Sequence, residues 1–579
     1  MRKTVLVLAV VALLFTGMIA TVTAPTVASS NGMVAAVDRY AAEAGAKILE
    51  MGGNAIDAAI AVSLALGVVE PYASGIGGEG YAVITMADGS KFAIDFRSTA
   101  PMLATYEALT EKGLRIGTIT RTPMGICVPG VLAGIREAWL LGATLPFSVL
   151  AQPAIDLARN GFLIDQTFSQ TTADNYELLL KNAFEFLNEG FVWETGTLYK
   201  NPELADTLER IVEEGIDTFY FGSLADEIEE FMIETDGFMR KSDLEIYNAI
   251  IREPLHGTYR GYDLFVPHPP VSGPQLLAVL NTLENYNLPA MSWDDPLAIH
   301  LIQQALILGD IDRRTYISDP DFHDLPYEGF MSKDYAKTRF MVINPGRVFD
   351  QPYASYLGNA YPFQEGATYE EALLAAFAEV ASNASDIDES PSTTHFSIVD
   401  KDGNAVAWTQ TLSSFFGTTT YFKGFFFNNE MGNYASSYRP GDVINLTGGM
   451  RPRTTICPTV IMKDGEVRWV VGTPGGARIM SMMVNLVVEL IDFNLPVDKA
   501  IRLPKFTGMW NDTTLRIEAG YPETTLNFLE KVLGHKLNIY NTYPDLYFGG
   551  PNIIAVEENG MMIGAGSIRR GGFASAPEF

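Results

Sequence analysis

Cysteine and positive charge are both scarce in this chain, and each shortage excludes a class of protein. Two cysteines, Cys127 and Cys457, among 579 residues cannot form a disulfide framework or a four-thiolate zinc site. Lys and Arg number 40 against 69 Asp and Glu, so the net charge is −29. Nucleic-acid binding relies on basic patches, so this acidity argues against a nucleic-acid partner. With 47% hydrophobic and 19% charged residues, the chain is expected to fold around a large core.

Common catalytic motifs are missing as well. The sequence has no G-x-x-x-x-G-K-[ST], H-E-x-x-H or G-x-S-x-G, which argues against a Walker-type nucleotide site, a zinc metalloprotease and an α/β-hydrolase. The six histidines are scattered and suggest no metal site. The glycine-rich stretch 75–80 precedes a strand pattern and lacks the dinucleotide-binding context. We therefore expect neither a metal nor an organic cofactor.

Residues 1–28 have the pattern of an export signal. Two basic residues precede an apolar run over 5–20, and small residues follow at 23–24 and 27–29. The alternative is an uncleaved N-terminal anchor. No later segment reaches about 18 uninterrupted apolar residues, so we expect no membrane contact beyond this signal. The mature protein is accordingly expected to be exported, and to be periplasmic, extracellular or at the cell surface.

The first two thirds of the chain are mostly helical in pattern. A helix is expected over 40–51, where Gly52-Gly53 ends it, and Asn54 caps a second helix to about residue 66. Residues 81–86 and 91–96 alternate like the strands of a hairpin. Further helical spacing occurs at 154–159, 204–214, 272–283, 296–308 and 369–381.

Beyond residue 390 the pattern changes to repeated hairpins. Alternating segments flank turn sequences at 400–404, 463–465 and 557–560. Amphipathic stretches at 479–491 and 523–533 are expected to cover the resulting sheet as helices. The chain is therefore predicted to be a layered α+β protein whose C-terminal third is richest in strands.

Ordered motifs run along nearly the whole mature chain. They are GGNAIDAA at 52–59, SGIGG at 74–78, DFR at 95–97, VPG at 128–130, PVSG at 270–273, TTH at 393–395, NNEM at 428–431, RP at 451–452 and GTPGGAR at 472–478. By these motifs the chain resembles the gamma-glutamyltransferase family, whose members are N-terminal-nucleophile amidohydrolases. The resemblance implies an enzyme with a four-layer αββα sandwich of antiparallel sheets covered by helices.

The chemistry of Thr393 can be argued beside the resemblance. A threonine hydroxyl is a poor nucleophile and needs a base. If the Ser392–Thr393 bond is cut, Thr393 gains an α-amine with a pKa of about 7.7–8.0, which suits a general base. The resemblance implies that Thr393 makes the cut itself. The products would be a large subunit, 29–392, and a small catalytic subunit, 393–579, which form a heterodimer with one intertwined structural domain.

Other catalytic roles are implied by matching positions. Thr411 matches the threonine whose hydroxyl contacts the nucleophile. Gly475 and Gly476 match the oxyanion-hole glycines, and backbone N–H groups in such a turn suit a developing anion.

Three further positions match the residues that bind the substrate α-carboxylate. Arg97 matches the arginine of that site, and a guanidinium can bind a carboxylate with two hydrogen bonds. Thr454 and Thr455 stand where the family usually has Ser-Ser, and both keep a hydroxyl.

The ammonium side of the expected pocket departs from the family. Ser413 stands where Asn is common and Asn433 where Asp is common, whereas Glu430 keeps its position. Hydrogen bonds to charged groups contribute roughly 1.5–3 kcal/mol, so losing one charged partner could lower affinity about tenfold or more. The segment 434–450, where some members carry a lid, is short, which predicts an open pocket.

The expected reaction is cleavage of a γ-glutamyl amide, with a glutathione-like donor as the first substrate hypothesis. The acyl group would pass through Thr393 to water, or to an amino acid or peptide. An alternative keeps this mechanism and changes the substrate to poly-γ-glutamate or a glutaryl-type amide. A third hypothesis, from another class, is a surface protein that binds without catalysis.

Overall fold

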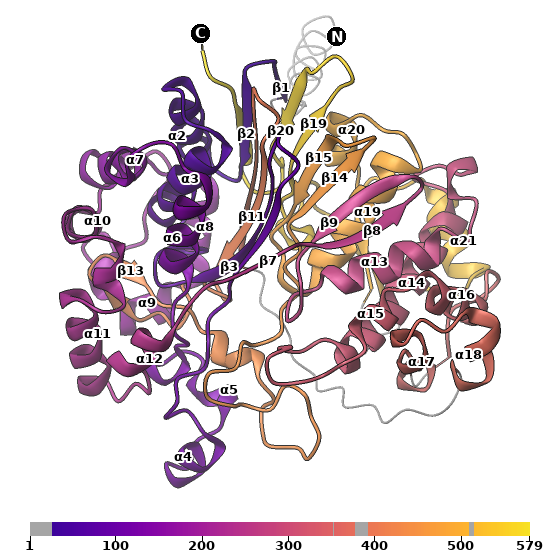
Figure 1. The fold of residues 1–579 in the computed structure, drawn as a ribbon, viewed down its shortest axis with the longest axis horizontal. Helices are drawn as coiled ribbons and strands as arrows, with labels where there is room; N and C mark the ends of the chain where they lie inside the picture. Colours follow the sequence, from indigo (N-terminus) through magenta and orange to yellow (C-terminus); the bar gives the residue numbers. More distant parts are fainter. Residues whose placement is uncertain (1–25, 351–352, 377–391, 509–513, 579) are drawn as a thin grey trace, which may run out of the picture.

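Two seven-stranded antiparallel sheets lie face to face at the centre of the structure (Figure 1). The structure is a computed structural model that describes residues 26–350, 353–376, 392–508 and 514–578. Helices cover the outer face of each sheet, so the chain is an αββα sandwich. The predicted α+β fold class is confirmed.

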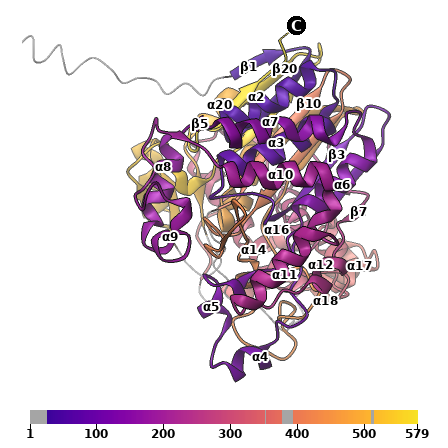
Figure 2. The same cartoon turned by 90° about the vertical axis from the view of Figure 1, so that its left-hand side faces the viewer.

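The first sheet contains the strand that follows Thr393. Helices α2 (Arg39–Glu50), α3 (Ala55–Val69) and α6 (Val131–Gly142) cover it, α7 (Phe147–Asn160) packs on α3, and α10 (Pro202–Glu214) packs on α7 (Figure 2). Every residue of α3 is buried, because α3 lies between the sheet and the outer helices. The strand order is β21 (Phe573–Ser575), β2 (Gly32–Ala36), β10 (Thr394–Asp400), β11 (Ala405–Thr411), β3 (Glu79–Thr85), β4 (Lys91–Phe96), β7 (Ile250–Arg252).

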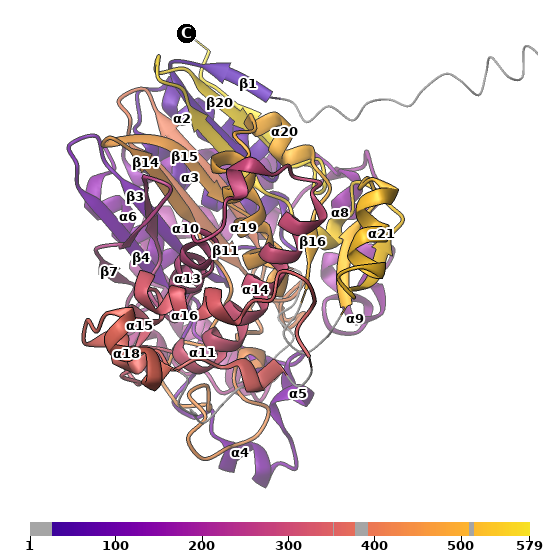
Figure 3. The same cartoon turned by 90° about the vertical axis from the view of Figure 1, so that its right-hand side faces the viewer.

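The second sheet lies under α13 (Gly273–Leu283), α14 (Pro296–Tyr316) and α19 (Ile479–Ile491), as Figure 3 shows from the opposite side. These helices bury a cluster of aliphatic side chains against the sheet. The strand order is β1 (Thr26–Ser29), β20 (Met562–Ala565), β19 (Asn552–Val556), β15 (Glu466–Gly472), β14 (Thr459–Lys463), β9 (Tyr262–Val266), β8 (Leu255–Tyr259).

Small side chains fill the space between the two sheets. Ala35, Ala407 and Ala574 of the first sheet face Val470 and Ile554 of the second in one buried cluster. Short apolar side chains at these positions let the sheets pack closely. The two larger apolar clusters lie between the sheets and the helices.

The remaining elements are short and lie around the sandwich. Small sheets are formed by β5 (Phe162–Leu163) with β6 (Leu198–Tyr199), by β12 (Tyr421–Phe422) with β13 (Phe425–Phe426), and by β16 (Phe506–Thr507), β17 (Thr514–Glu518) and β18 (Lys536–Tyr540). The other helices are α4 (Tyr106–Glu111), α5 (Ile116–Ile119), α8 (Gln166–Asp174), α9 (Tyr176–Asn182), α11 (Ser223–Glu234), α12 (Lys241–Ile246), α15 (Tyr327–Phe330), α16 (Lys333–Val342), α17 (Tyr361–Gln364), α18 (Tyr369–Ala376), α20 (Val497–Arg502) and α21 (Glu523–Lys531).

The locally encoded elements are where the sequence predicts them. Asn54 caps α3, and the Asn54 backbone N–H donates to the Asp57 carboxylate in a capping box. The hairpins at 400–404, 463–465 and 557–560 all form. The predicted helix 369–381 is α18 up to Ala376, and its last residues lie outside the described part.

The helical stretch beyond residue 130 also contributes strands that the sequence pattern did not predict. β7, β8 and β9 each have three to five residues; β7 and β8 lie at sheet edges, and β9 lies between β8 and β14. So short a segment shows too few alternations for a strand pattern to be visible.

The predicted signal, residues 1–28, overlaps the first strand. Strand β1 pairs with β20 from Thr26 onward, so removal of residues 1–28 would take most of this strand. The small residues at 23–24, within the predicted cleavage zone, precede Thr26. No helix in the described residues is long and apolar enough to span a membrane.

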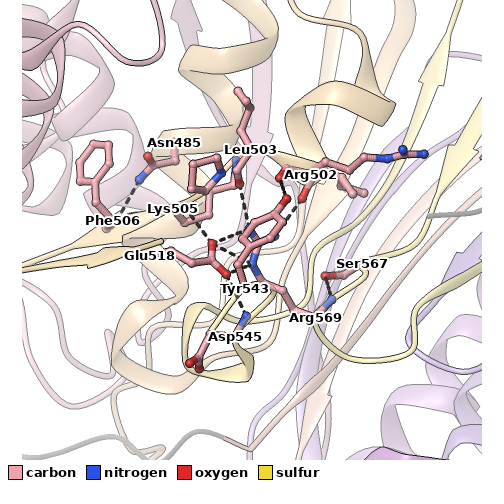
Figure 4. A network of polar contacts seen from close by, with 12 residues as sticks. Asn485, Arg502, Leu503, Lys505, Phe506, Glu518, Tyr543, Asp545, Ser567 and Arg569 are labelled. Atoms are coloured by element: carbon pink, nitrogen blue, oxygen red, sulfur yellow. Dashed lines mark hydrogen bonds and ion pairs between the residues drawn. The ribbon is translucent and has the colours of Figure 1, made fainter. Parts of the chain in front are cut away.

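A buried ionic network holds the C-terminal segment against the three-stranded sheet (Figure 4). The Arg569 guanidinium donates to Glu518 at 2.6 Å and to the carbonyls of Ile501 and Leu503 at 2.8 Å each. Lys505 donates to Glu518 through its backbone N–H and pairs with Glu489 through its ammonium. The position of the next residue, Arg570, is set by this anchor.

Each of the two large sheets contains strands from before residue 393 and strands from after it. The pairs β2–β10, β3–β11, β9–β14, β1–β20 and β2–β21 each join a strand before residue 393 to one after it. A cut at the predicted Ser392–Thr393 bond would leave all of these pairings in place.

We therefore expect the cut protein to remain one particle. Wild-type protein, once cut, should elute in native size-exclusion chromatography at the volume of uncut Thr393→Ala protein, because the shared sheets and core hold the two chains together. Denaturing electrophoresis of the same peak should separate them. Elution of two smaller species under native conditions would contradict this.

Candidate active site

Thr393 lies directly before β10, at one end of the inner strands of the first sheet. Its side chain is buried, and its φ angle is +106°. A β-branched residue rarely adopts a positive φ, so the backbone is strained at this residue. The Ser392 hydroxyl donates to the Ala73 carbonyl at 3.5 Å. The strain thus falls on the peptide that the sequence predicts to be cut.

Thr411 ends the neighbouring strand and lies opposite Thr393. The register pairs Thr394 with Gln410, which brings the two threonines side by side. The Thr393 hydroxyl donates to Thr411 Oγ1 at 3.2 Å, and the Ser413 backbone N–H donates to the same oxygen at 2.8 Å. Thr411 therefore holds the Thr393 hydroxyl in a defined orientation.

A small cavity adjoins Thr393. Its volume is about 10 Å³, which is roughly the space for one water molecule. The open pocket expected from the short segment 434–450 is therefore absent from the uncut chain; this segment folds back, and Tyr434 donates to the Met450 carbonyl. The lining residues are Thr393, Thr411, Ser413, Glu430, Asn433, Thr454, Thr455, Gly476 and Ile479.

The Gly475–Gly476 turn lies beside the cavity and requires glycine at both positions. The φ angles are +143° and +55°, which favour glycine at both positions. Thr455 Oγ1 donates to the Gly476 carbonyl at 2.8 Å and steadies the turn, which leads into α19. Within the described residues neither glycine N–H donates a hydrogen bond. Both N–H groups are thus free to bind an anion.

Arg97 does not line the cavity. It is fully buried at the end of β4; Nη2 donates to Glu430 Oε2 at 2.9 Å and to the Pro452 carbonyl at 3.0 Å. Its other arm, Nη1, pairs with Glu79. The sequence analysis did not identify Glu79 as a site residue. Its distinguishing feature is that it is a carboxylate in a strand, β3, in which every residue is buried.

Asn433 faces the only charged side chain that lines the cavity, Glu430. Its Nδ2 donates to Glu430 Oε2 at 2.7 Å. An aspartate at this position would place a second carboxylate beside Glu430, whereas the asparagine gives it a donor. Ser413, the other departure, lies in the cavity wall with a φ angle of +74°.

Arg570 is a second residue that the sequence analysis missed. Its Nη1 donates to the Thr393 carbonyl at 2.6 Å, and its guanidinium lies over the Phe415 ring. Nε lies 3.6 Å from Glu70 Oε1, which also accepts a hydrogen bond from Tyr72 at 3.0 Å. No local sequence pattern connects Arg570 with a residue 177 positions away.

Carboxylates outnumber cations behind Thr393. Burial raises the pKa of Glu70, and the charge of Arg570 opposes that rise. Burial, the charge of Glu70 and the charge of Asp165 raise the pKa of Asp38 to about 7. Asp38 is also the N-cap of α2 and accepts from the Tyr40 and Ala41 N–H groups. A proton is therefore bound in this cluster up to near-neutral pH.

No histidine serves Thr393 as a base. His395, two residues away, is buried, and burial lowers its pKa to about 3. Its ring nitrogens face Thr409 Oγ1 at 2.8 Å and Ser397 Oγ at 3.1 Å, so it is a neutral structural residue. The described residues contain no group of three His, Cys, Asp or Glu side chains arranged to hold a metal ion.

Comparisons with known proteins agree with this geometry. The family model described as gamma-glutamyltranspeptidase matches residues 41–576. The glutathione hydrolase proenzyme of Escherichia coli is 34% identical over 563 residues, covering 94% of this chain and 91% of that protein. The acylase ACY 1 proenzyme of Pseudomonas sp. strain SE83 is 32% identical over 558 residues, covering 94% and 93%.

Solved structures share the fold. The crystal structure of cephalosporin acylase from Bacillus halodurans superposes with a TM-score of 0.83 at 26% identity, covering 96% of this chain and 97% of that one. The gamma-glutamyltranspeptidase of Helicobacter pylori matches with a TM-score of 0.52 at 38% identity, covering 54% of this chain and 91% of that one.

Arg570 is expected to set the rate of chain cleavage. Arg570→Met removes the donor to the Thr393 carbonyl and should slow the cut by about tenfold or more, whereas Arg570→Lys keeps one donor and should slow it less. The appearance of two chains on denaturing gels measures the rate. Arg468→Met is the control, because Arg468 donates only to the Val556 carbonyl, at 3.4 Å.

Loss of Arg570 also leaves Glu70 buried without a cation. The double variant Arg570→Met/Glu70→Gln removes that unpaired charge, and its circular dichroism spectrum reports folding. If this variant folds and is cut at the wild-type rate, Arg570 has no part in cleavage.

Asp38 should make the fold less stable as pH rises. Its folded pKa of about 7 lies above the ordinary value of 3.8, so the folded state holds the proton more tightly. Stability should fall between about pH 4 and pH 7, by on the order of a few kcal/mol, and level off above. Asp38→Asn keeps an N-cap and should flatten this slope in thermal unfolding at pH 4.5 to 8. An unchanged slope would contradict the assignment.

Proposed function

Because the chain belongs to the gamma-glutamyltranspeptidase family, and is thus an enzyme of the N-terminal-nucleophile hydrolase type, we propose that Thr393 is both its self-cleavage residue and its catalytic nucleophile. The single observation that carries this proposal is the Thr393–Thr411 hydroxyl pair, 3.2 Å apart, beside a strained Thr393 backbone. The substrate we propose is a γ-glutamyl amide of the glutathione type.

Self-cleavage begins with the Thr393 hydroxyl attacking the Ser392 carbonyl carbon. The C–N bond breaks, and the hydroxyl proton is transferred to the departing nitrogen, which becomes the Thr393 α-amine. Ser392 is then held as an ester on the Thr393 oxygen. Water then hydrolyses the ester to a Ser392 carboxylate and a free Thr393 hydroxyl. The positive φ of Thr393 supports this order, since breaking the peptide bond relieves the strain.

Turnover uses the amine that the cut creates. The Thr393 α-amine accepts the hydroxyl proton as the oxygen attacks the donor carbonyl. The Gly475 and Gly476 N–H groups would stabilise the negative oxygen of the tetrahedral intermediate. The leaving amine takes the proton and departs, which leaves an acyl-enzyme ester. Water releases the acid, or the amine of an amino acid or peptide accepts the acyl group.

The cavity residues support recognition of a small polar acyl group. Glu430 would bind an ammonium, with Asn433 and Ser413 beside it, and the Thr454 hydroxyl would donate to a carboxylate. Named relatives of similar identity include both a glutathione hydrolase and an acylase, so the acyl group varies among proteins this similar. Poly-γ-glutamate and glutaryl-type amides therefore stay as alternative substrates.

Binding without catalysis is the weaker hypothesis. A merely structural threonine pair would not explain two unengaged glycine N–H groups beside the same cavity. We further propose export through residues 1–28, with the signal removed ahead of Thr26 so that β1 is kept, and division of the mature chain after Ser392 into a large and a small subunit.

Removal of the Thr393 hydroxyl should abolish both reactions. Wild-type protein is expected to give two chains by intact mass, one of them starting at Thr393, and to hydrolyse γ-glutamyl-p-nitroanilide. Thr393→Ala should remain one chain without turnover, while Thr393→Ser keeps a hydroxyl and should still be cut. A single uncut wild-type chain would overturn the proposal, as would turnover by Thr393→Ala.

A further inference from the structure

The acyl cavity has a negative wall and no positive one. Glu430 is the only charged side chain among its lining residues, and the lining threonines and serine are neutral. An ammonium group on the acyl chain would meet a carboxylate there. A carboxylate group on the acyl chain would be repelled by Glu430. Only the neutral hydroxyl groups of the cavity could donate hydrogen bonds to it.

Arg97, the arginine that the resemblance assigns to a substrate carboxylate, already has a partner on each arm of its guanidinium. Arg97 Nη2 donates to Glu430, Nη1 pairs with Glu79, and the side chain is fully buried. One cation is thus shared between two carboxylates. To bind a substrate carboxylate, Arg97 would have to leave a partner that is itself buried, which exposes an unpaired charge.

Glu79 is held firmly in this position. It is fully buried, and its Oε2 accepts hydrogen bonds from the Ser98 backbone N–H at 2.8 Å and from the Ser98 hydroxyl at 3.0 Å. The sheet register sets it between the other groups, because Glu79 pairs with Thr411 on one side and the adjoining pair Gly80–Phe96 brings it beside Arg97 on the other.

We propose that Glu79 determines the acyl specificity of this enzyme: by holding Arg97 it leaves the cavity without a free cation, so acyl groups with an ammonium and no carboxylate are preferred. A 4-aminobutanoyl amide has this chemistry. A glutaryl amide has the reverse, and a γ-glutamyl amide carries both groups. The inference rests on the proposed function of Thr393 and narrows its substrate class.

Four p-nitroanilides separate the contributions of the two groups. The γ-glutamyl donor carries both charges, the 4-aminobutanoyl donor only the ammonium, the glutaryl donor only the carboxylate, and the butyryl donor neither. For wild-type enzyme we expect kcat/KM for the 4-aminobutanoyl donor to exceed that for the glutaryl donor by about tenfold or more, the size of one charge-assisted hydrogen bond. Equal rates with these two donors would overturn the inference.

Glu79→Gln is the decisive variant, since it keeps the shape and frees the charge of Arg97. We expect the ratio of glutaryl to 4-aminobutanoyl kcat/KM to rise by about tenfold or more. Glu430→Gln should lower kcat/KM for the two ammonium-bearing donors and raise it for the glutaryl donor, because the variant removes the like charge and frees one arm of Arg97. Ratios within one preparation are independent of how much of it is folded and cut, because all donors use the same nucleophile.

A matched control removes a buried carboxylate from a different arginine. Asp312 lies 3.0 Å from Arg339 and does not line the cavity, so Asp312→Asn should leave the donor ratios unchanged. If Glu79→Gln also leaves them within twofold of wild type, Glu79 does not set specificity. If cut wild-type enzyme turns over none of the four donors, the proposed function itself fails, which is a separate result.

Discussion

The register of four neighbouring strands is the constraint on which the site depends. Across β10, β11, β3 and β4 the pairings align Thr393 with Thr411, Thr411 with Glu79, and Glu79 with Arg97 at one end of these strands. A shift by one residue would turn each of these side chains to the opposite face. Close packing on both faces of this sheet prevents such a shift, so the core fixes the nucleophile, its hydrogen-bond partner and the buried ion pair together.

Two buried arginines of the C-terminal segment, Arg569 and Arg570, also position the site. Arg569 anchors the C-terminal segment through Glu518, and this anchor aims Arg570 at the Thr393 carbonyl. Breaking such a pair leaves a buried charge without a partner, which costs several kcal/mol. The strained Thr393 backbone is therefore kept by interactions from the far end of the chain. An acidic protein can in this way concentrate its few cations where they position backbone and carboxylates.

Several features could be predicted because their causes are local. Asn54 and Asp57 form a capping box within four residues, and the hairpin turns carry their own Gly and Asn signals. The short strands β7 and β9 could not be predicted, since they pair with β4 and β14, which are distant in sequence. Glu79 and Arg570 could not be predicted as site residues for the same reason. Their partners lie 18 and 177 residues away, so no local sequence pattern indicates these contacts.

The sequence by itself determined the hairpins, the capped helices, the family and the chemistry available to Thr393, because each follows from neighbouring residues or ordered motifs. Only the tertiary structure decided which groups face the cavity. Arg97 has the right chemistry for a substrate carboxylate, yet the fold buries it between Glu79 and Glu430. Charge recognition depends on burial and on distances between segments hundreds of residues apart, and these exist only once the two sheets have packed.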